Sequence, residues 1–293
     1  MTQLIRSPFL LAESLKKSGA RGKPLGLVPT MGYLHEGHLS LVRASRAEND
    51  LTVVSVFVNP TQFGPNEDFG KYPRDEARDA ALLELEGADF IFAPAVEDMY
   101  LPGHSVFADE SDLSRCLCGA SRPGHFRGVC TVVLKLFNIV RPTRAYFGTK
   151  DYQQVKVIQR MVRDLNVPVE IRPCPIVREQ DGLAMSSRNA LLSREGRKAA
   201  RTLYASLSGA SALYRKGERH PEVLRGAVLS VLEACPSVSP EYVEIRDAEN
   251  LGHLDTLSGP ALLAIAARVE GVRLIDNAVL GTGEGRTGSG QSR

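Results

Sequence analysis

Short apolar runs of strand type alternate with longer segments of helical spacing between residues 25 and 177. The runs LGLVP (25–29), LTVVSVFV (51–58) and DFIFAP (89–94) are continuous, as in parallel strands buried on both faces. Further strands are predicted at 144–148 and 169–177, and helices at 38–49, 74–87, 124–142 and 152–166. This order predicts right-handed βαβ units and an α/β fold with a doubly wound, Rossmann-like parallel sheet.

The pattern changes after residue 177. Residues 193–235 have the spacing of two helices with a break at Gly217, and strands are predicted at 241–248 and within 261–280, where Glu270-Gly271 forms the turn. We therefore expect a smaller α+β C-terminal domain. The predicted division is a nucleotide- and substrate-binding domain at 1–176, a lid domain at 177–282 and a disordered, glycine-rich tail at 283–293.

Charge and composition exclude several classes of function. The 36 Lys and Arg against 34 Asp and Glu give a net charge of +2, which argues against a protein built chiefly to bind nucleic acid or anionic membrane. No apolar run approaches the roughly 20 residues of a membrane span, and the first residues lack a signal-peptide pattern. The five cysteines do not have the spacing of a zinc site, so we expect reduced thiols and a cytoplasmic protein.

The segment PTMGYLHEGHLSLV (29–42) is the first candidate for chemistry, because it follows a predicted strand. Ligands of doubly wound sheets bind beyond the carboxyl ends of the strands. His35 and His38 are three residues apart at a helix start, where free N–H groups favour a phosphate, and Gly37 allows close approach. The alternatives are two surface histidines in a loop or, with less support, a zinc site that lacks a third ligand nearby.

The segment AMSSRNALLS (184–193) is the second candidate. Arg188 can bind phosphate oxygens as a charged fork, and Ser186 and Ser187 can donate hydrogen bonds to them. Taken alone, this segment is better explained as a helix N-cap. Its occurrence together with the first segment favours a nucleotide site.

His35-Glu36-Gly37-His38 and Met185-Ser186-Ser187-Arg188 resemble the two signature sequences of the nucleotidylyl-transferase superfamily. Five blocks resemble the pantothenate synthetase (pantoate–β-alanine ligase) family more closely, and they span residues 29–189, about half of the chain. These blocks are PTMGYLHEGH, FVNPTQF (57–63), RPGHFRGV (122–129), FGTKDYQQ (147–154) and AMSSRN (184–189).

The resemblance implies a Rossmann-like fold of the nucleotidylyl-transferase type and an AMP-forming carbon–nitrogen ligase. Such an enzyme uses ATP and Mg²⁺ to condense (R)-pantoate with β-alanine through a pantoyl adenylate, and it releases AMP and diphosphate. The reaction belongs to pantothenate biosynthesis. The family also implies a homodimer, whereas the sequence identifies no protein ligand of Mg²⁺ and no base for the amine.

Site residues carried over from the family fall into three groups. The catalytic group is His38, assisted by His35, Lys150 and Arg188, and the charges of His38, Lys150 and Arg188 would offset repulsion between anions. Gln62 and Gln154 would hold pantoate. The ATP site would comprise Met31, Gly32, Tyr33, Leu34, His35, Glu36, Gly37, His38, Gly148, Thr149, Lys150, Asp151, Val177, Met185, Ser186, Ser187 and Arg188.

Several positions stay open on the sequence alone. Arg122 and His125 precede a predicted helix and either bind an anion or cap the helix, and Asp151 could be a simple N-cap. Asp79 lies where the family can carry a metal-associated acid, but we interpret it as a surface charge. The chain has Thr61 where the family usually has Met, and Thr149 where Glu is usual.

Three rival functions remain. An adenylyltransferase would keep the nucleotide motifs but would not use Gln62 and Gln154 as a pair. A class I aminoacyl-tRNA synthetase is disfavoured because the chain is short and has no basic anticodon-binding domain. A non-catalytic nucleotide-binding module would bind ATP without releasing diphosphate.

Overall fold

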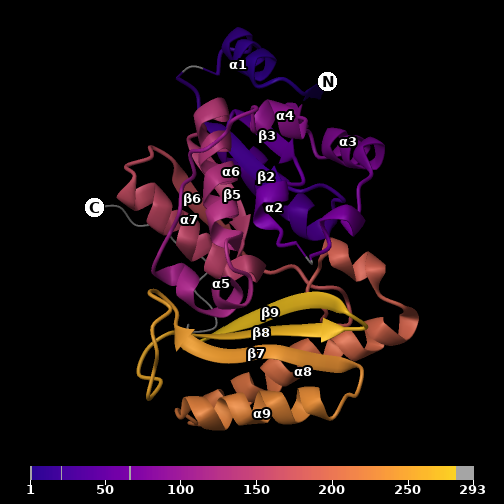
Figure 1. The fold of residues 1–293 in the computed structure, drawn as a ribbon, viewed down its shortest axis with the longest axis vertical. Helices are drawn as coiled ribbons and strands as arrows, with labels where there is room; N and C mark the ends of the chain where they lie inside the picture. Colours follow the sequence, from indigo (N-terminus) through magenta and orange to yellow (C-terminus); the bar gives the residue numbers. More distant parts are fainter. Residues whose placement is uncertain (1, 21, 66, 282–293) are drawn as a thin grey trace.

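The computed structural model describes residues 2–20, 22–65 and 67–281, and the predicted tail at 283–293 lies outside these residues. Figure 1 shows an α/β part that holds the N-terminal half of the chain and, beneath it, a small sheet backed by two helices. The predicted fold class is confirmed. The two parts meet along one face of the small sheet.

The large sheet is parallel and has the strand order β1-β4-β3-β2-β5-β6. The order reverses between β2 and β5, so loops leaving these two strands diverge and open a crevice, the usual ligand site of such sheets. The six strands are β1 (Gln3–Ile5), β2 (Leu25–Thr30), β3 (Leu51–Val56), β4 (Phe90–Phe92), β5 (Arg144–Gly148) and β6 (Glu170–Cys174).

Helices cover both faces of this sheet, which is why its strands are continuously apolar. Leu27 and Val53 pack in the core cluster that contains helices α6 (His125–Val140) and α7 (Tyr152–Asp164). Val28 and Val54 lie on the opposite face, with helices α2 (Glu36–Glu48) and α3 (Glu76–Leu85). Successive strand residues thus enter two separate cores.

Some short elements were not anticipated from the sequence. Arg6 and Pro8 interrupt the first apolar stretch, yet β1 forms at the sheet edge, and Pro8 is the first residue of α1 (Pro8–Lys17) with Ser7 as N-cap. Between β4 and α6 lie α4 (Val96–Met99), η3 (Leu113–Arg115) and α5 (Leu117–Ser121). These elements are too short for hydrophobic periodicity to reveal them.

The C-terminal part consists of α8 (Arg194–Arg215), α9 (Pro221–Glu233) and the antiparallel strands β7 (Val238–Asp247), β8 (Ala261–Val269) and β9 (Val272–Leu280). Both predicted helices and the turn at Glu270-Gly271 are confirmed. Every residue of β8 except Arg268 is buried. Leu262 and Ala264 pack in the same core cluster as α6, whereas Leu263 and Ile265 pack against α8 and α9.

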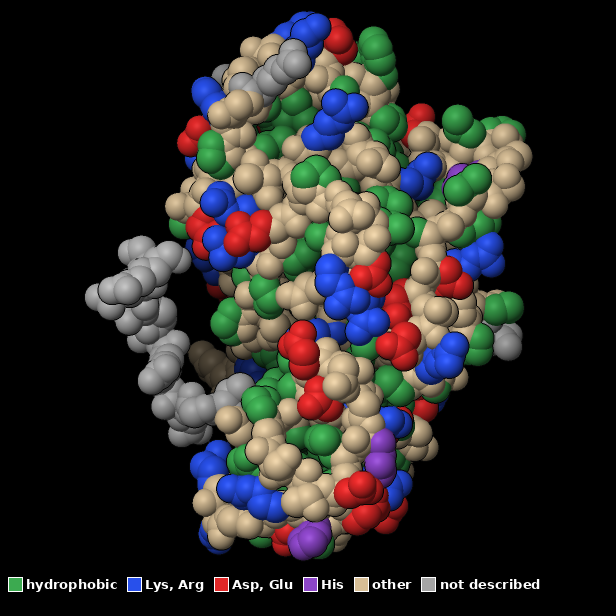
Figure 2. All heavy atoms as spheres, turned by 90° about the vertical axis from the view of Figure 1, so that its left-hand side faces the viewer, with side chains coloured by type: hydrophobic (Ala, Val, Ile, Leu, Met, Phe, Trp, Pro, Cys, Tyr) green, Lys and Arg blue, Asp and Glu red, His purple; other side chains and the backbone are tan. Residues whose placement is uncertain are grey.

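Lys and Arg side chains are intermixed with Asp and Glu on the face shown in Figure 2, without an extended patch of one sign. This distribution agrees with the small net charge. In the part of the chain that the structure describes, no helix is both long and apolar enough to cross a membrane.

Candidate active site

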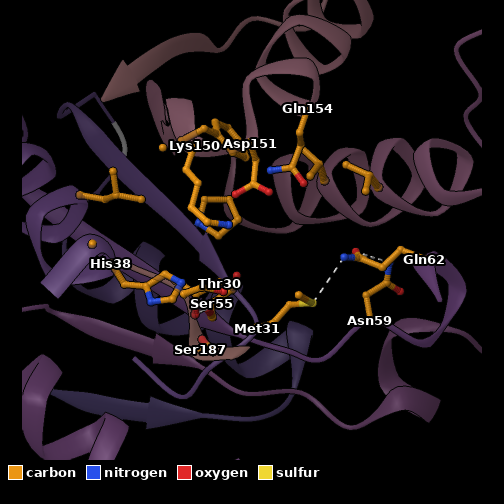
Figure 3. A pocket seen from close by; sticks show the side chains of 18 of the residues that line it. Thr30, Met31, His38, Ser55, Asn59, Gln62, Lys150, Asp151, Gln154 and Ser187 are labelled. Carbon is orange, nitrogen blue, oxygen red and sulfur yellow. Dashed lines mark hydrogen bonds between the residues drawn. The ribbon is translucent and has the colours of Figure 1, made fainter. Parts of the chain in front are cut away.

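Both candidate segments line one cavity of about 220 Å³ at the crevice between β2 and β5. In Figure 3, Gln62 and Asn59 lie together at one end of the cavity, apart from His38. Lys150, Asp151 and Gln154 lie on another side of the cavity. The cavity therefore joins groups that are far apart in the sequence. Among the residues lining it are Met31, His35, Gly37, His38, Gln62, Gly148, Lys150, Asp151, Gln154, Val177, Met185, Ser186, Ser187 and Arg188.

Five residues predicted for the ATP site do not line this cavity: Gly32, Tyr33, Leu34, Glu36 and Thr149. Leu34 is buried in the core, and Glu36 forms an ion pair with Arg43 on the surface. The hydroxyl of Thr149 donates a hydrogen bond to the carbonyl of Cys174, at 3.0 Å. These residues support the wall rather than face the space within it.

The loop before α2 is held by Asp79, whose two carboxylate oxygens accept the backbone N–H groups of Tyr33 at 2.6 Å and Leu34 at 2.7 Å. Gly32 and Tyr33 have φ angles of +79° and +51°, which bend the chain sharply. Asp79 is only 1% exposed, so its interpretation as a surface charge was wrong. The helical pattern of α3 did not reveal that this acid faces inward and satisfies free donors of the loop.

His35 and His38 lie together, with ring centroids 4.0 Å apart. The backbone N–H of His35 donates to Nδ1 of His38 at 3.4 Å, so the proton of a neutral His38 ring is on Nε2. A Cβ at Gly37 would lie 2.9 Å from Cε1 of His35, so only glycine lets the ring pack there. This geometry confirms that the two histidines are neighbours at the helix N-terminus.

Burial lowers the pKa of both histidines. Burial, assisted by the charge of Lys150, lowers the pKa of His35 to about 4. Burial and the neighbouring His35 lower the pKa of His38 well below its usual value. These shifts favour a neutral His38 ring that offers an N–H donor, with Lys150 as the nearby cation, and the contribution of positive charge by His38 during the reaction stays a prediction.

Two buried polar atoms in the cavity wall, Nδ1 of His35 and Oγ of Ser55, have no hydrogen-bond partner among the described residues. Buried polar atoms are rarely left unpaired, so a ligand is the natural partner for them. Sequence reasoning missed Ser55, although a serine within the apolar run LTVVSVFV was a usable signal.

The second segment reaches the first through Ser187, whose hydroxyl donates to the carbonyl of Tyr33 at 3.1 Å. Ser186 is the N-cap of the 3₁₀ turn η5 (Ser187–Leu191), which confirms the capping interpretation, and it also lines the cavity. Arg188 pairs with Asp68 through Nε at 2.7 Å and Nη2 at 2.9 Å. Asp68, which the sequence did not single out, thus holds the guanidinium at the cavity.

Gln62 lies in the 3₁₀ turn η1 (Pro60–Gln62), and its side-chain amide has a defined orientation. Nδ2 of Asn59 donates to Oε1 of Gln62 at 3.0 Å, which leaves Nε2 of Gln62 as a donor beside Met31 (Figure 3). Asn59 therefore orients Gln62, the residue predicted to bind the substrate.

Arg122 and His125 fix the backbone of the same turn. The Gln62 carbonyl accepts hydrogen bonds from Nδ1 of His125 at 2.9 Å and from Nη2 of Arg122 at 3.2 Å. Arg122 also pairs with Glu67 at 2.6 Å. A Cβ at Gly128 would lie 2.6 Å from the backbone nitrogen of Gln62, so glycine allows η1 to pack directly on α6.

Adjacent glutamines in α7 have different tasks. Gln154 lines the cavity, whereas Gln153 is buried and bonds to the backbone of Cys118, Leu113 and Cys116.

Asp151 precedes α7 without a side-chain capping bond, so its carboxylate remains available to the cavity. Among the described residues there is no group of three or more His, Cys, Asp or Glu side chains able to hold a metal.

The family model described as "Pantoate-beta-alanine ligase" matches residues 3–279 of the chain. Relatives named pantothenate synthetase from Pseudothermotoga lettingae and Thermotoga neapolitana are each 59% identical over 259 residues, which is 88% of this chain and 92% of theirs. The pantothenate synthetase structure from Thermus thermophilus has a TM-score of 0.90 at 46% identity, covering 94% of this chain and 98% of that one. The Francisella tularensis pantoate-beta-alanine ligase, complexed with "Beta-gamma ATP and Beta-alanine", has a TM-score of 0.79 at 33% identity and covers 95% and 98%.

We predict that Asp79→Asn destabilises the fold by about 1–3 kcal/mol, because an amide N–H₂ group would face a backbone N–H that now donates to the carboxylate. Urea unfolding measures this change. Asp75→Asn is the matched control, since Asp75 is the exposed N-cap of the same helix and Asn caps equally well. Equal unfolding free energies for Asp79→Asn and wild type would contradict the role of Asp79.

We also predict that the free energy of unfolding falls as the pH is lowered from about 6.5 to 4. Burial, with the charge of Arg122, lowers the pKa of His125 to about 4 in the folded protein, while the unfolded value is about 6.5. Within this window the unfolded chain binds a proton that the folded chain does not. The contribution is fully present above about pH 6.5, and up to about 3 kcal/mol is lost near pH 4.

The variant His125→Asn tests this assignment, because its amide N–H₂ can still donate to the Gln62 carbonyl but does not titrate. Urea unfolding between pH 4.5 and pH 7 should give a shallower decline for the variant than for wild type. Parallel curves would show that His125 is not the source.

Proposed function

The chain belongs to the pantoate-beta-alanine ligase family, and from this membership we propose that it joins (R)-pantoate to β-alanine through an enzyme-bound pantoyl adenylate, releasing AMP and diphosphate. One observation carries the mechanism: the two histidines, the Ser-Ser-Arg segment and the two glutamines line a single cavity. Phosphate-binding groups and amide groups suited to a hydroxy acid are thus within reach of one pair of substrates.

In the first step, a carboxylate oxygen of pantoate forms a bond to the α-phosphorus of ATP, and the bond from that phosphorus to the bridging oxygen of diphosphate breaks. This step brings anions together, so fixed donors and cations must offset their repulsion. Lys150 supplies positive charge in the cavity, and Arg188 supplies a guanidinium held in place by Asp68. The neutral His38 ring donates from Nε2 to a phosphate oxygen as charge moves onto diphosphate.

In the second step, the β-alanine amine attacks the acyl carbon, AMP leaves with the former carboxylate oxygen, and the nitrogen loses a proton. Gln62 and Gln154 hold pantoate for both steps. Because Asn59 fixes the Oε1 end of the Gln62 amide, the N–H₂ group, which here contacts Sδ of Met31, is oriented to donate to pantoate oxygens. Pantoate has two hydroxyls and a carboxylate, and it therefore needs several oriented donors and acceptors.

Mg²⁺ fits this cavity as a partner of the ATP phosphates. The ion is usually held by substrate phosphates, water and one or two carboxylates, so a cluster of three acidic ligands is not needed. Asp151 is a carboxylate in the cavity lining whose side chain makes no capping bond, and we propose it as the protein contact. Bound there, Mg²⁺ would neutralise negative charge on the phosphates.

The remaining assignments follow the family resemblance. Met31, Gly37, Gly148, Val177, Met185, Ser186 and Ser187 line the cavity and are proposed to contact ATP. Gly32, Tyr33, Leu34, Glu36 and Thr149 would act by shaping the wall. The division at residues 176/177 with a lid at 177–282, the homodimer and the cytoplasmic location also belong to the proposal.

The proposed mechanism predicts the fate of one oxygen atom. With pantoate labelled by ¹⁸O in its carboxylate, ATP and β-alanine, mass spectrometry should find AMP that carries one ¹⁸O. Formation of ADP would overturn the adenylate and mean transfer of the γ-phosphoryl group. Diphosphate release that requires a phosphorylated acceptor in place of pantoate would favour an adenylyltransferase, and ATP binding without turnover would favour a non-catalytic module.

We predict that Gln62→Ala raises the KM for pantoate by about 10–100-fold, which corresponds to the loss of a hydrogen bond to a charged oxygen. The dissociation constant of ATP should change by less than about threefold, since Gln62 lies at the end of the cavity away from His38 (Figure 3). Steady-state kinetics and calorimetry measure the two effects. The control is Gln159→Ala, in α7 but not in the cavity lining. A selective loss of ATP affinity would refute the assignment.

A further inference from the structure

We propose that Asn277 of β9 is a positioning residue for Lys150. Through Asn277, the C-terminal sheet determines where this lysine lies in the active site. The inference rests on the role of Lys150 in the proposed function. Nδ2 of Asn277 donates hydrogen bonds to the carbonyl oxygens of Thr149 at 3.0 Å and Lys150 at 2.9 Å. These two bonds use both N–H groups of the amide.

The segment that Asn277 holds is short and bears two of the proposed ligands. The 3₁₀ turn η4 (Thr149–Asp151) connects the end of β5 to the start of α7, and both Lys150 and Asp151 line the cavity. Such a turn has few hydrogen bonds of its own. Its carbonyl groups therefore depend on an external donor, and Asn277 provides it from the other part of the molecule.

Asn277 lies on the face of β9 that packs against the α/β part, where most of its neighbours are apolar. Ile275 and Val279, which point the same way along the strand, pack against the core cluster of the α/β part. Asn277 itself is 5% exposed. A buried amide is costly unless it is hydrogen bonded, so the two bonds to η4 are the favourable interaction that compensates for its burial.

The opposite face of β9 is fixed as well. Asp276 accepts two hydrogen bonds from Arg178, at 2.7 Å and 2.9 Å, and the Arg178 guanidinium lies 4.2 Å from the centre of the Tyr204 ring in α8. Asn277 thus projects from a strand whose opposite face is anchored by the ion pair of Asp276 with Arg178.

A second contact anchors the same junction: the hydroxyl of Tyr152 donates to the carbonyl of Ala248 at 2.8 Å, just after β7. Lys150, Asp151 and Asn277 also border a smaller cavity of about 70 Å³ between the two parts. A movement of the C-terminal part must therefore carry η4 along or break these bonds. As long as the bonds of Asn277 hold, the position of Lys150 follows that of the C-terminal sheet.

The dissociation constant of ATP tests the inference, measured by calorimetry with the full-length protein and Mg²⁺. We expect a rise of about tenfold for Asn277→Ala, and a larger rise for Asn277→Asp, because a carboxylate would face two carbonyl oxygens. If Asn277 only filled space, the isosteric Asp variant would be the milder one. That order, or unchanged affinity in both variants, would overturn the inference.

A double-mutant cycle shows whether the effect passes through Lys150. Asn277→Ala made in a Lys150→Ala background should weaken ATP binding by less than about twofold, since the group being positioned is already gone. Equal factors in both backgrounds would overturn the inference while leaving the proposed function intact. Wild-type affinity of Lys150→Ala would refute the role of Lys150, and the inference would fall with it.

Asn49→Ala is the matched control. Asn49 is also a buried asparagine, 8% exposed, and its amide donates to the carbonyl of Ser45 and the hydroxyl of Tyr146, outside the cavity lining. We expect a fall in melting temperature similar to that of Asn277→Ala, with unchanged ATP affinity. A comparable loss of ATP affinity in Asn49→Ala would reduce the Asn277 effect to general destabilisation and overturn the inference.

Discussion

The bonds from the Asp79 carboxylate to two backbone N–H groups hold the loop on which the active site is built. This loop leaves β2 where the strand order reverses, turns through two residues with positive φ and delivers His35 and His38 to the start of α2. The carbonyl oxygen of Tyr33 in this loop accepts a hydrogen bond from the hydroxyl of Ser187, which joins the second segment to the first. One buried carboxylate thereby connects α3, which does not line the cavity, to the placement of both candidate segments.

Charge in the cavity is distributed in a way that favours polyphosphate binding without charged imidazoles. Burial lowers the pKa of His35 and His38, which favours neutral rings that offer oriented hydrogen-bonding groups beside Lys150. Arg188 and Arg122 are each paired with an acid, Asp68 and Glu67, which fixes both guanidinium groups before any ligand arrives. Such pre-organisation reduces the conformational entropy lost on binding.

Local patterns and the rules of βαβ connection were sufficient to predict the parallel sheet and its main helices, whereas the meeting of the two segments was predicted from their occurrence together and from the family resemblance. The continuous run LTVVSVFV marks a strand buried on both faces, and the carboxyl ends of such strands share one edge. The partners of the site residues could not be predicted in this way. Asp68 lies 120 positions from Arg188, and Asp79 lies 46 positions from Tyr33, so only the folded chain pairs them. The protonation of His38 likewise depends on burial, which the sequence does not reveal.

Strand β8 is enclosed between two layers, with Leu262 and Ala264 facing the α/β part and Leu263 and Ile265 facing α8 and α9. A fragment that began after β6 would expose Leu262, Ile275 and Val279 to water along a flat apolar sheet. We expect such a truncated fragment to aggregate rather than remain an independent module. The C-terminal third of the chain therefore depends on its packing against the α/β part. Its insertion into another protein would require another apolar surface to cover the same face of the small sheet.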